Sequence, residues 1–317
     1  MKNQFFTRRD FIKLATSGAM ILSQSNLIAG EIINPKGIKP KIIDWSYGIK
    51  PLYCLAYIDP EYNLHKGQES FIARYPVSVI PQDSGASYSR FRNRLKVLNP
   101  YQKVLAYQVT LDENELSGPG HDQLRKLKNS WLTLPGGMIP TININSGGKF
   151  KDFKLYDPRD LRFRQQFVEV CKNLVIENGF DGIFLDNCAI YERFAKIPYI
   201  GIELVDALQN LILEVRNALP NAILIGNSRY NWKGLNGEMN ENRAAELSKE
   251  VIPLSNRGVS EANMFHYYMK NSEDLFSAEY YFRWALENRC FFGTGINAQT
   301  IRWYPFFDKV LSEYEII

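Results

Sequence analysis

The chain is poor in the residues that hold metal ions or build disulfide frameworks. Its 317 residues include four cysteines and three histidines, with no C-x-x-C pair and no H-E-x-x-H motif. Zinc sites and disulfide-rich scaffolds need such residues in short, regular spacings. We therefore expect a protein that works without a metal ion and without a cofactor.

Motifs of nucleotide binding and serine-hydrolase chemistry are also missing. Residues 293–298 read G-T-G-I-N-A, but too few residues follow them for the βαβ unit of a dinucleotide site. Gly147-Gly148-Lys149-Phe150 lacks the hydroxyl residue and the spacing of a P-loop, and no G-x-S-x-G motif occurs. These absences exclude the commonest phosphate-binding and acyl-transfer sites.

The chain also lacks a strong net charge and a long apolar run. Its formal net charge is +4, and residues 1–30 supply +3 of it. The remaining chain gives no reason to expect nucleic acid or an acidic membrane surface as a partner. The apolar run at 14–29 contains Ser, Gln, Asn and Gly, so it is too short and too polar to span a membrane, and we expect no membrane anchor.

Residues 1–30 resemble a twin-arginine signal peptide. Residues 7–13 read T-R-R-D-F-I-K, and small residues at 29–30 offer a cleavage site. The resemblance implies the twin-arginine export machinery as a partner and a periplasmic or secreted mature protein. The alternative is a basic amphipathic helix of the mature fold. Such cargo folds before export in a reducing compartment, so we favour four free or incidentally paired thiols over a disulfide framework.

The rest of the chain alternates between short apolar runs and helical stripes. Phe163, Phe167, Cys171 and Leu174 make one such stripe, and it ends at Asn178-Gly179. Alternating strands and helices favour parallel pairing, because a parallel connection needs a long crossover. The predicted strands are 52–58, 77–82, 104–110, 180–187, 222–228, 258–264 and 290–297, with 138–144 ambiguous.

About seven such units indicate an α/β fold, a (β/α)8 TIM-type barrel formed by residues 38–317 as a single domain. Only 20 residues follow Asn297, so the last unit is predicted to be incomplete or atypical. Either an early segment at 41–45 completes the ring, or the chain is truncated.

The run G-F-D-G-I-F-L-D-N at 179–187 holds a carboxylate at each end of one predicted strand. Side chains alternate along a strand, so Asp181 and Asp186 face opposite sides. Ile183 and Leu185 suit the side that faces the helices, which leaves Asp186 toward the barrel axis at the carboxyl end, where barrel enzymes carry their chemistry. Asp181 is then a turn residue at the opposite end. The alternative for Asp186 is a hydrogen-bonded loop carboxylate.

A second carboxylate is needed for work on a glycosidic bond. Glu261, at the end of G-V-S-E two predicted strands later, is the candidate, unless it caps a helix or forms a salt bridge. Asp157, followed by proline, fits a helix N-cap better. The other candidates are polar or aromatic residues at strand ends that could bind a sugar or pack in loops: Asp59, Tyr107, Gln108, Asn187, Asn227, Arg229, Tyr230 and Trp232.

The runs L-Y-D-P-R-D-L-R-F-R-Q-Q at 155–166, G-F-D-G-I-F-L-D-N and G-V-S-E-A-N-M at 258–264 resemble (β/α)8 glycoside hydrolases related to the endo-α-1,4-polygalactosaminidase family. The resemblance covers roughly residues 52–297. It implies that Asp186 is the nucleophile or base and Glu261 the acid/base partner. Cys188 and Ala189, which follow G-F-D-G-I-F-L-D-N, depart from the polar residues expected there.

We therefore predict an exported glycoside hydrolase that cleaves a poly- or oligosaccharide with Asp186 and Glu261. The alternative is a barrel of the cell envelope that binds carbohydrate without cleaving it.

Overall fold

The computed structural model describes thirteen stretches of the chain. The predicted signal peptide, residues 1–30, lies outside them. The described residues are 41–43, 51–55, 68–81, 86–112, 123–124, 126–127, 129–146, 149–188, 201–227, 232–241, 263–269, 274–295 and 303–316.

Eight parallel strands form a nearly closed barrel, which confirms the predicted fold class. The seam between its first and last strands stays open apart from an isolated bridge, among the described residues, between Leu52 and Phe292, where the Phe292 N–H donates to the Pro51 carbonyl over 2.9 Å. In spatial order the strands are β2 (Tyr53–Leu55), β3 (Val77–Pro81), β4 (Lys103–Val109), β7 (Gly182–Asp186), β8 (Ile223–Asn227), β9 (Gly237–Glu241), β10 (Met264–Tyr268) and β11 (Phe291–Gly295).

The eighth strand of this barrel is β9, which the sequence did not reveal. It lies between β8 and β10 and pairs in parallel with both. The prediction that 41–45 completes the ring is wrong. In that segment β1 (Lys41–Ile43) pairs instead with β12 (Tyr314–Ile316) in a separate two-stranded parallel sheet.

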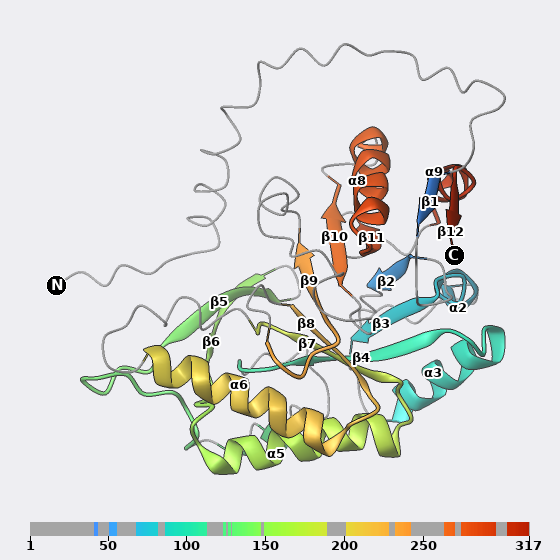
Figure 1. Cartoon of the computed structure of the whole chain (residues 1–317). Coiled ribbons are helices and arrows are strands. Elements are labelled where there is room, and N and C mark those ends of the chain that lie inside the picture. Colours follow the sequence, from blue (N-terminus) through green and yellow to red (C-terminus); the bar gives the residue numbers. More distant parts are fainter. Residues whose placement is uncertain are drawn as a thin grey trace, which may run out of the picture.

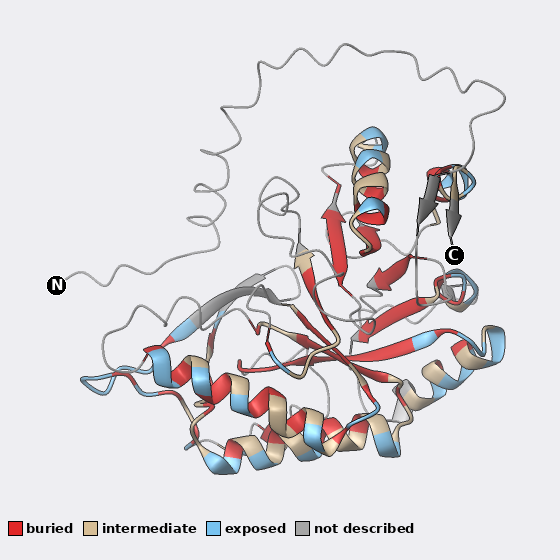
Figure 2. Cartoon of the chain, viewed as in Figure 1, coloured by how far each residue is buried: buried red, intermediate tan, exposed pale blue. Residues whose placement is uncertain are grey.

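Helices cover the outside of the barrel through their apolar stripes (Figures 1 and 2). The long pair α5 and α6 lies side by side, and Arg164 of α5 and Glu214 of α6 approach to 2.7 Å. The described helices are α2 (Gln68–Ile72), α3 (Ala86–Leu98), α5 (Leu161–Lys172), continued by the π-helix η2 (Asn173–Glu177), α6 (Gly201–Ala218), α8 (Leu275–Glu287) and α9 (Pro305–Leu311).

An antiparallel hairpin interrupts the connection from β4 to α5. It consists of β5 (Thr141–Ser146) and β6 (Lys149–Lys154), and the ambiguous segment at 138–144 falls largely in its first strand (Figure 1). A connection from a barrel strand to the following helix leaves the carboxyl end of that strand. The hairpin therefore belongs to the same face of the barrel as the end of β7.

All four cysteines are buried and free, as predicted. Burial raises the pKa of the Cys188 and Cys290 thiols to about 12 and the pKa of Cys54 and Cys171 further still. These thiols are core residues with little thiolate at neutral pH.

Candidate active site

Asp186 is the last residue of β7 and is only partly buried, whereas the four residues before it are buried. The ring of Phe184, two residues earlier, stacks on the ring of Tyr107 in β4, with centroids 5.8 Å apart. The hydroxyl of Tyr107 also contacts Asp186. Phe184, Asp186 and Tyr107 therefore share one face of the sheet.

This face is the inside of the barrel, as the strand register shows. Asn227, which contacts Asp186, pairs with Met239 of β9, and Met239 pairs with Met264 of β10. His266, two residues further along β10, contacts the hydroxyl of Tyr53 in β2, 3.0 Å from its Nδ1. Since β11 separates β10 from β2, this contact crosses the interior. Asp186 thus lies at the carboxyl end of the barrel and points inward, as the alternation predicted.

Each carboxylate oxygen of Asp186 accepts a hydrogen bond from a neighbouring strand. Asn227 Nδ2, at the end of β8, donates to Oδ1 over 2.8 Å, and the Tyr107 hydroxyl donates to Oδ2. Both donors are neutral, and among the described residues no cation lies within salt-bridge distance of Asp186. Two neutral donors therefore fix the orientation of the carboxylate at the barrel mouth.

Asp181 immediately precedes the first residue of the same strand. Its Oδ2 accepts the Val104 N–H over 2.8 Å and lies 2.7 Å from the Lys96 ammonium. Its own N–H donates to the Val104 carbonyl over 3.0 Å. The predicted structural position of Asp181 is confirmed by these contacts, which fasten the start of β7 to β4 and α3.

Three residues predicted to bind sugar have contacts with protein groups or lie in the core. Asn187 has a positive φ of 61° and donates to Asp112 Oδ2 over 2.6 Å. Gln108 is fully buried and donates to the Val109 carbonyl over 2.8 Å. Trp232 is 6% exposed, so its ring is packed into the core.

The predicted partner carboxylate Glu261 lies outside the described residues. The described strand of that region, β10, begins at Met264 and ends at Tyr268, so it starts where the predicted strand ended. Glu261 precedes the first residue of β10 in the chain. Asp59, Arg229 and Tyr230 also lie outside the described residues.

Two further acidic residues occupy strand ends on the described part of the barrel. Glu241 is the last residue of β9, and its register partner in β10 is His266. Asp112 follows β4, is 1% exposed, accepts the Asn187 amide and bridges Leu155. Sequence reasoning missed Glu241 because it missed β9. The alternation of Gly237 and Met239 with polar residues was the available signal.

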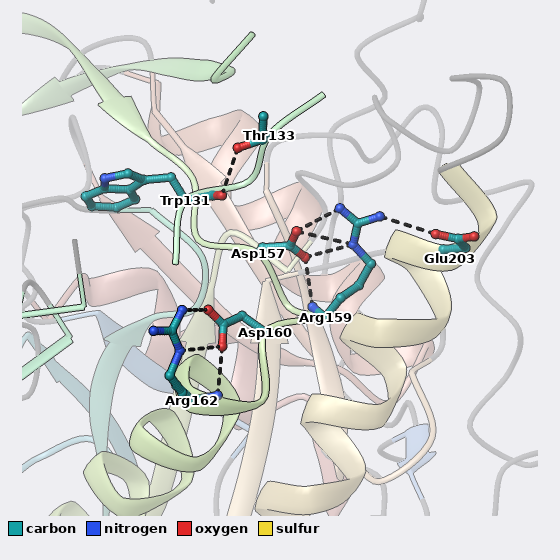
Figure 3. A network of polar contacts seen from close by, with 7 residues as sticks. All are labelled: Trp131, Thr133, Asp157, Arg159, Asp160, Arg162 and Glu203. Atoms are coloured by element: carbon teal, nitrogen blue, oxygen red, sulfur yellow. Dashed lines mark hydrogen bonds and ion pairs between the residues drawn. The ribbon is translucent and has the colours of Figure 1, made fainter. Parts of the chain in front are cut away.

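A network of charged residues holds the start of α5 at the same face of the barrel (Figure 3). Asp160 is the N-cap of α5 and accepts the Arg162 N–H over 2.8 Å, so the predicted N-cap at Asp157 is wrong. Asp157 instead accepts the Arg159 N–H and guanidinium, and Arg159 also reaches Glu203 of α6 at 3.2 Å. This network ties the segment that precedes α5 to the first turn of α6.

The hydrogen bond from the Arg162 guanidinium is the main cause that lowers the pKa of Asp160 to about 2. Asp160 therefore remains a charged cap at the positive end of the α5 dipole across the physiological range. Its carboxylate is committed to the helix and is unsuited to proton transfer.

In the described stretches, no group of three or more His, Cys, Asp or Glu side chains is placed to hold a metal ion. Nor does any helix of those stretches have the length and apolarity needed to cross a membrane.

Comparison with known families and curated proteins found no match for this sequence. Comparison with solved structures found the glycoside hydrolase domain of PelA from Pseudomonas aeruginosa. It is 11% identical, with a TM-score of 0.57 over 78% of this chain and 95% of that one. A glutamate-to-alanine variant of that domain matches with a TM-score of 0.56.

A GH31 family sulfoquinovosidase from E. rectale, solved with an aza-sugar inhibitor, is similarly 11% identical. Its TM-score is 0.50 over 87% of this chain, and the match spans 47% of that protein. At such identity the likeness concerns the fold. The chain therefore has the barrel fold seen in glycoside hydrolase domains.

Proposed function

We propose that this protein is a glycoside hydrolase that cleaves a poly- or oligosaccharide, with Asp186 as one of two essential carboxyl groups. The observation that carries the proposal is the position of Asp186, at the carboxyl end of a barrel strand, facing inward and held at both oxygens. The fold shared with glycoside hydrolase domains supports it.

The reaction needs a carboxylate and a carboxylic acid on opposite sides of the glycosidic bond. Asp186 bonds to the anomeric carbon, or removes a proton from the water that does so. The bond from that carbon to the leaving oxygen breaks, and its electron pair stays on that oxygen. The second carboxyl group gives that oxygen a proton. When Asp186 is the nucleophile, water then bonds to the anomeric carbon as the bond from that carbon to Asp186 breaks, and the second carboxylate takes a proton from that water.

The second carboxyl group has two candidates. The resemblance to glycoside hydrolases favours Glu261, and the position at a strand end favours Glu241. Glu241 ends β9, two strands from β7 in the barrel, on the face where barrel enzymes carry their chemistry. Glu261→Gln and Glu241→Gln decide between them, since the essential residue should lose about as much activity as Asp186 does. Glu203→Gln is the matched control, because Glu203 lies at the same face but is bound to Arg159.

The test of the proposal is release of reducing ends from a panel of polysaccharides that includes α-1,4-linked polygalactosamine. Cleavage of one polymer by the wild type, and its loss in Asp186→Asn, would support the proposal. Binding of a polymer without release of reducing ends would identify the alternative, a barrel that binds carbohydrate of the cell envelope without cleaving it.

Export through the twin-arginine machinery to the periplasm or the medium is part of the same proposal. It is supported by residues 7–13, which match the signal. Replacement of both Arg8 and Arg9 by lysine should keep the precursor in the cytoplasm with residues 1–30 attached. Normal processing of that double variant would refute the export route.

A further inference from the structure

We propose that Tyr107 is a positioning residue for Asp186, rather than a residue that binds the sugar. The inference rests on the proposed function and deepens it by naming how the essential carboxylate is oriented. Tyr107 lies on β4, the strand beside β7, and its hydroxyl donates to Asp186 Oδ2.

The register explains why a tyrosine is needed at this place. The residue of β4 directly opposite Asp186 is Val109, which has no polar side-chain atom. Tyr107 lies one inward layer below, opposite Phe184. Its long side chain extends along the barrel interior, and its hydroxyl reaches the carboxylate of the layer above. A phenylalanine would fill the same space without the hydrogen bond.

The ring of Tyr107 is held as firmly as its hydroxyl. Tyr107 is 5% exposed, and its ring stacks on Phe184 with an interplanar angle of 21°. Phe184 belongs to the same strand as Asp186, two residues earlier. Tyr107 is thus held by two residues of β7, its ring by Phe184 and its hydroxyl by Asp186. The hydroxyl and the carboxylate therefore have little freedom to move relative to each other.

Asn227 completes the arrangement from the other side. An amide nitrogen can only donate, so the 2.8 Å contact makes Asp186 Oδ1 an acceptor. Donors on the two flanking strands then fix the plane of the carboxylate. Because the reaction requires an oxygen aligned with the anomeric carbon or with water, a small rotation of this plane should cost about 100-fold in rate.

The experiment compares Tyr107→Phe with the wild type on the polymer found in the reducing-end panel. We expect kcat to fall on the order of 100-fold with KM unchanged, because the hydroxyl contacts the carboxylate and not the sugar. In the Asp186→Asn background the same substitution should cause no further loss. Asn227→Ala should give the same pattern with a similar decrease.

Tyr53→Phe is the matched control, since it also removes a buried tyrosine hydroxyl that forms a hydrogen bond. Tyr53 is the first residue of β2, and its hydroxyl contacts His266. We expect its kcat to stay within about threefold of the wild type. A raised KM in Tyr107→Phe with kcat unchanged would overturn the inference in favour of sugar binding. Equal losses in Tyr107→Phe and Tyr53→Phe would also overturn it, by indicating a general packing effect.

A second measurement is independent of turnover. A double-mutant cycle compares the urea unfolding midpoints of Tyr107→Phe, Asp186→Asn and the double variant. We expect the shift in the double variant to differ from the sum of the two single shifts. Non-additive shifts without hydrolysis of any polymer would refute the proposed function and leave the contact intact. Hydrolysis with additive shifts and unchanged kcat would refute the positioning role alone.

Discussion

β7 ends at one aspartate and is immediately preceded by another, and the two have opposite surroundings. At the amino end, Asp181 accepts a backbone N–H and lies beside the ammonium of Lys96. At the carboxyl end, Asp186 is held by the hydroxyl of Tyr107 and the amide of Asn227, both neutral. Four residues separate a carboxylate paired with an ammonium from one held by neutral donors alone.

The difference shows how a barrel separates stability from chemistry. A carboxylate that accepts a backbone N–H and an ammonium contributes to the fold and has little left to offer a substrate. A carboxylate held by neutral donors stays available to a developing positive charge, such as that of an oxocarbenium-like transition state. The comparison predicts that substitutions near the two ends will affect different measurements.

The largest effect is expected at the carboxyl end. Asp186→Asn should lower turnover by about 1,000-fold or more, because it removes the charge from the reacting position. The melting temperature should stay close to that of the wild type, since asparagine keeps the shape and can still accept the Asn227 amide through its oxygen. An active Asp186→Asn on the polymer identified by the panel would reverse the comparison.

The second effect tests packing at the amino end of β7. A Cβ on Gly182 would lie 1.9 Å from the Ile223 carbonyl oxygen, which is backbone and cannot turn away. Gly182→Ala should therefore force β7 and β8 apart and reduce the free energy of unfolding by about 3 kcal/mol or more in urea titrations.

Gly136→Ala is the control for that substitution, because Gly136 has a φ of 85° with nothing within 4 Å of an added Cβ. It should lose only about 1 kcal/mol, from backbone strain. Equal losses in the two variants would show that the contact with Ile223 relaxes without cost.

The third effect concerns the barrel interior between the two ends. Burial lowers the pKa of His266 to about 3, below its ordinary value of 6.5. Between these values the unfolded chain binds a proton that the folded protein excludes. Neutral His266 therefore makes its full contribution to the free energy of unfolding above about pH 6.5. That contribution falls by about 2 kcal/mol on going to pH 5.

Urea unfolding at pH 7 and pH 5 measures this contribution. His266→Gln should lose less stability than the wild type between the two pH values, by about that 2 kcal/mol, whatever its stability at pH 7. Equal losses would show that water reaches His266 through the barrel mouth.

The sequence predicted the parts of the molecule that follow from local pattern. Alternation along 179–187 placed Asp181 and Asp186 on opposite faces, and the helical stripe at 163–174 corresponds to the buried residues of α5 and the start of η2. The scattered cysteines were predicted to be free or incidentally paired thiols rather than a disulfide framework, and all four are buried and free. In each case the signal lies within a few residues.

The parts that escaped prediction depend on contacts distant in sequence. The strand β9 reads G-E-M-N-E, which is too polar to stand out, and it is held by its register with β8 and β10. The role of Tyr107 depends on Asp186, 79 residues away. The N-cap of α5 was wrongly predicted at Asp157 rather than Asp160, because only the fold turns Asp157 toward the Arg159 guanidinium.

The smallest effect is expected at the amino end, for Asp181→Asn. Asparagine can still accept the Val104 N–H, but it loses the charge that lies 2.7 Å from the Lys96 ammonium. Both side chains are about one-fifth exposed, so Lys96 would be left partly desolvated beside a neutral partner. We expect a loss of about 1 kcal/mol, and at most about 3, in the free energy of unfolding.

Turnover per folded molecule should be unchanged in Asp181→Asn, because four residues separate the substitution from Asp186 at the mouth. Asp206→Asn, at an exposed position of α6, is the control for removal of a surface charge and should change the free energy of unfolding by less than about 0.5 kcal/mol. If Asp181→Asn were fully stable but inactive, the division of β7 into a structural end and a chemical end would be wrong. The search for the essential carboxylate would then move to the amino end of the barrel.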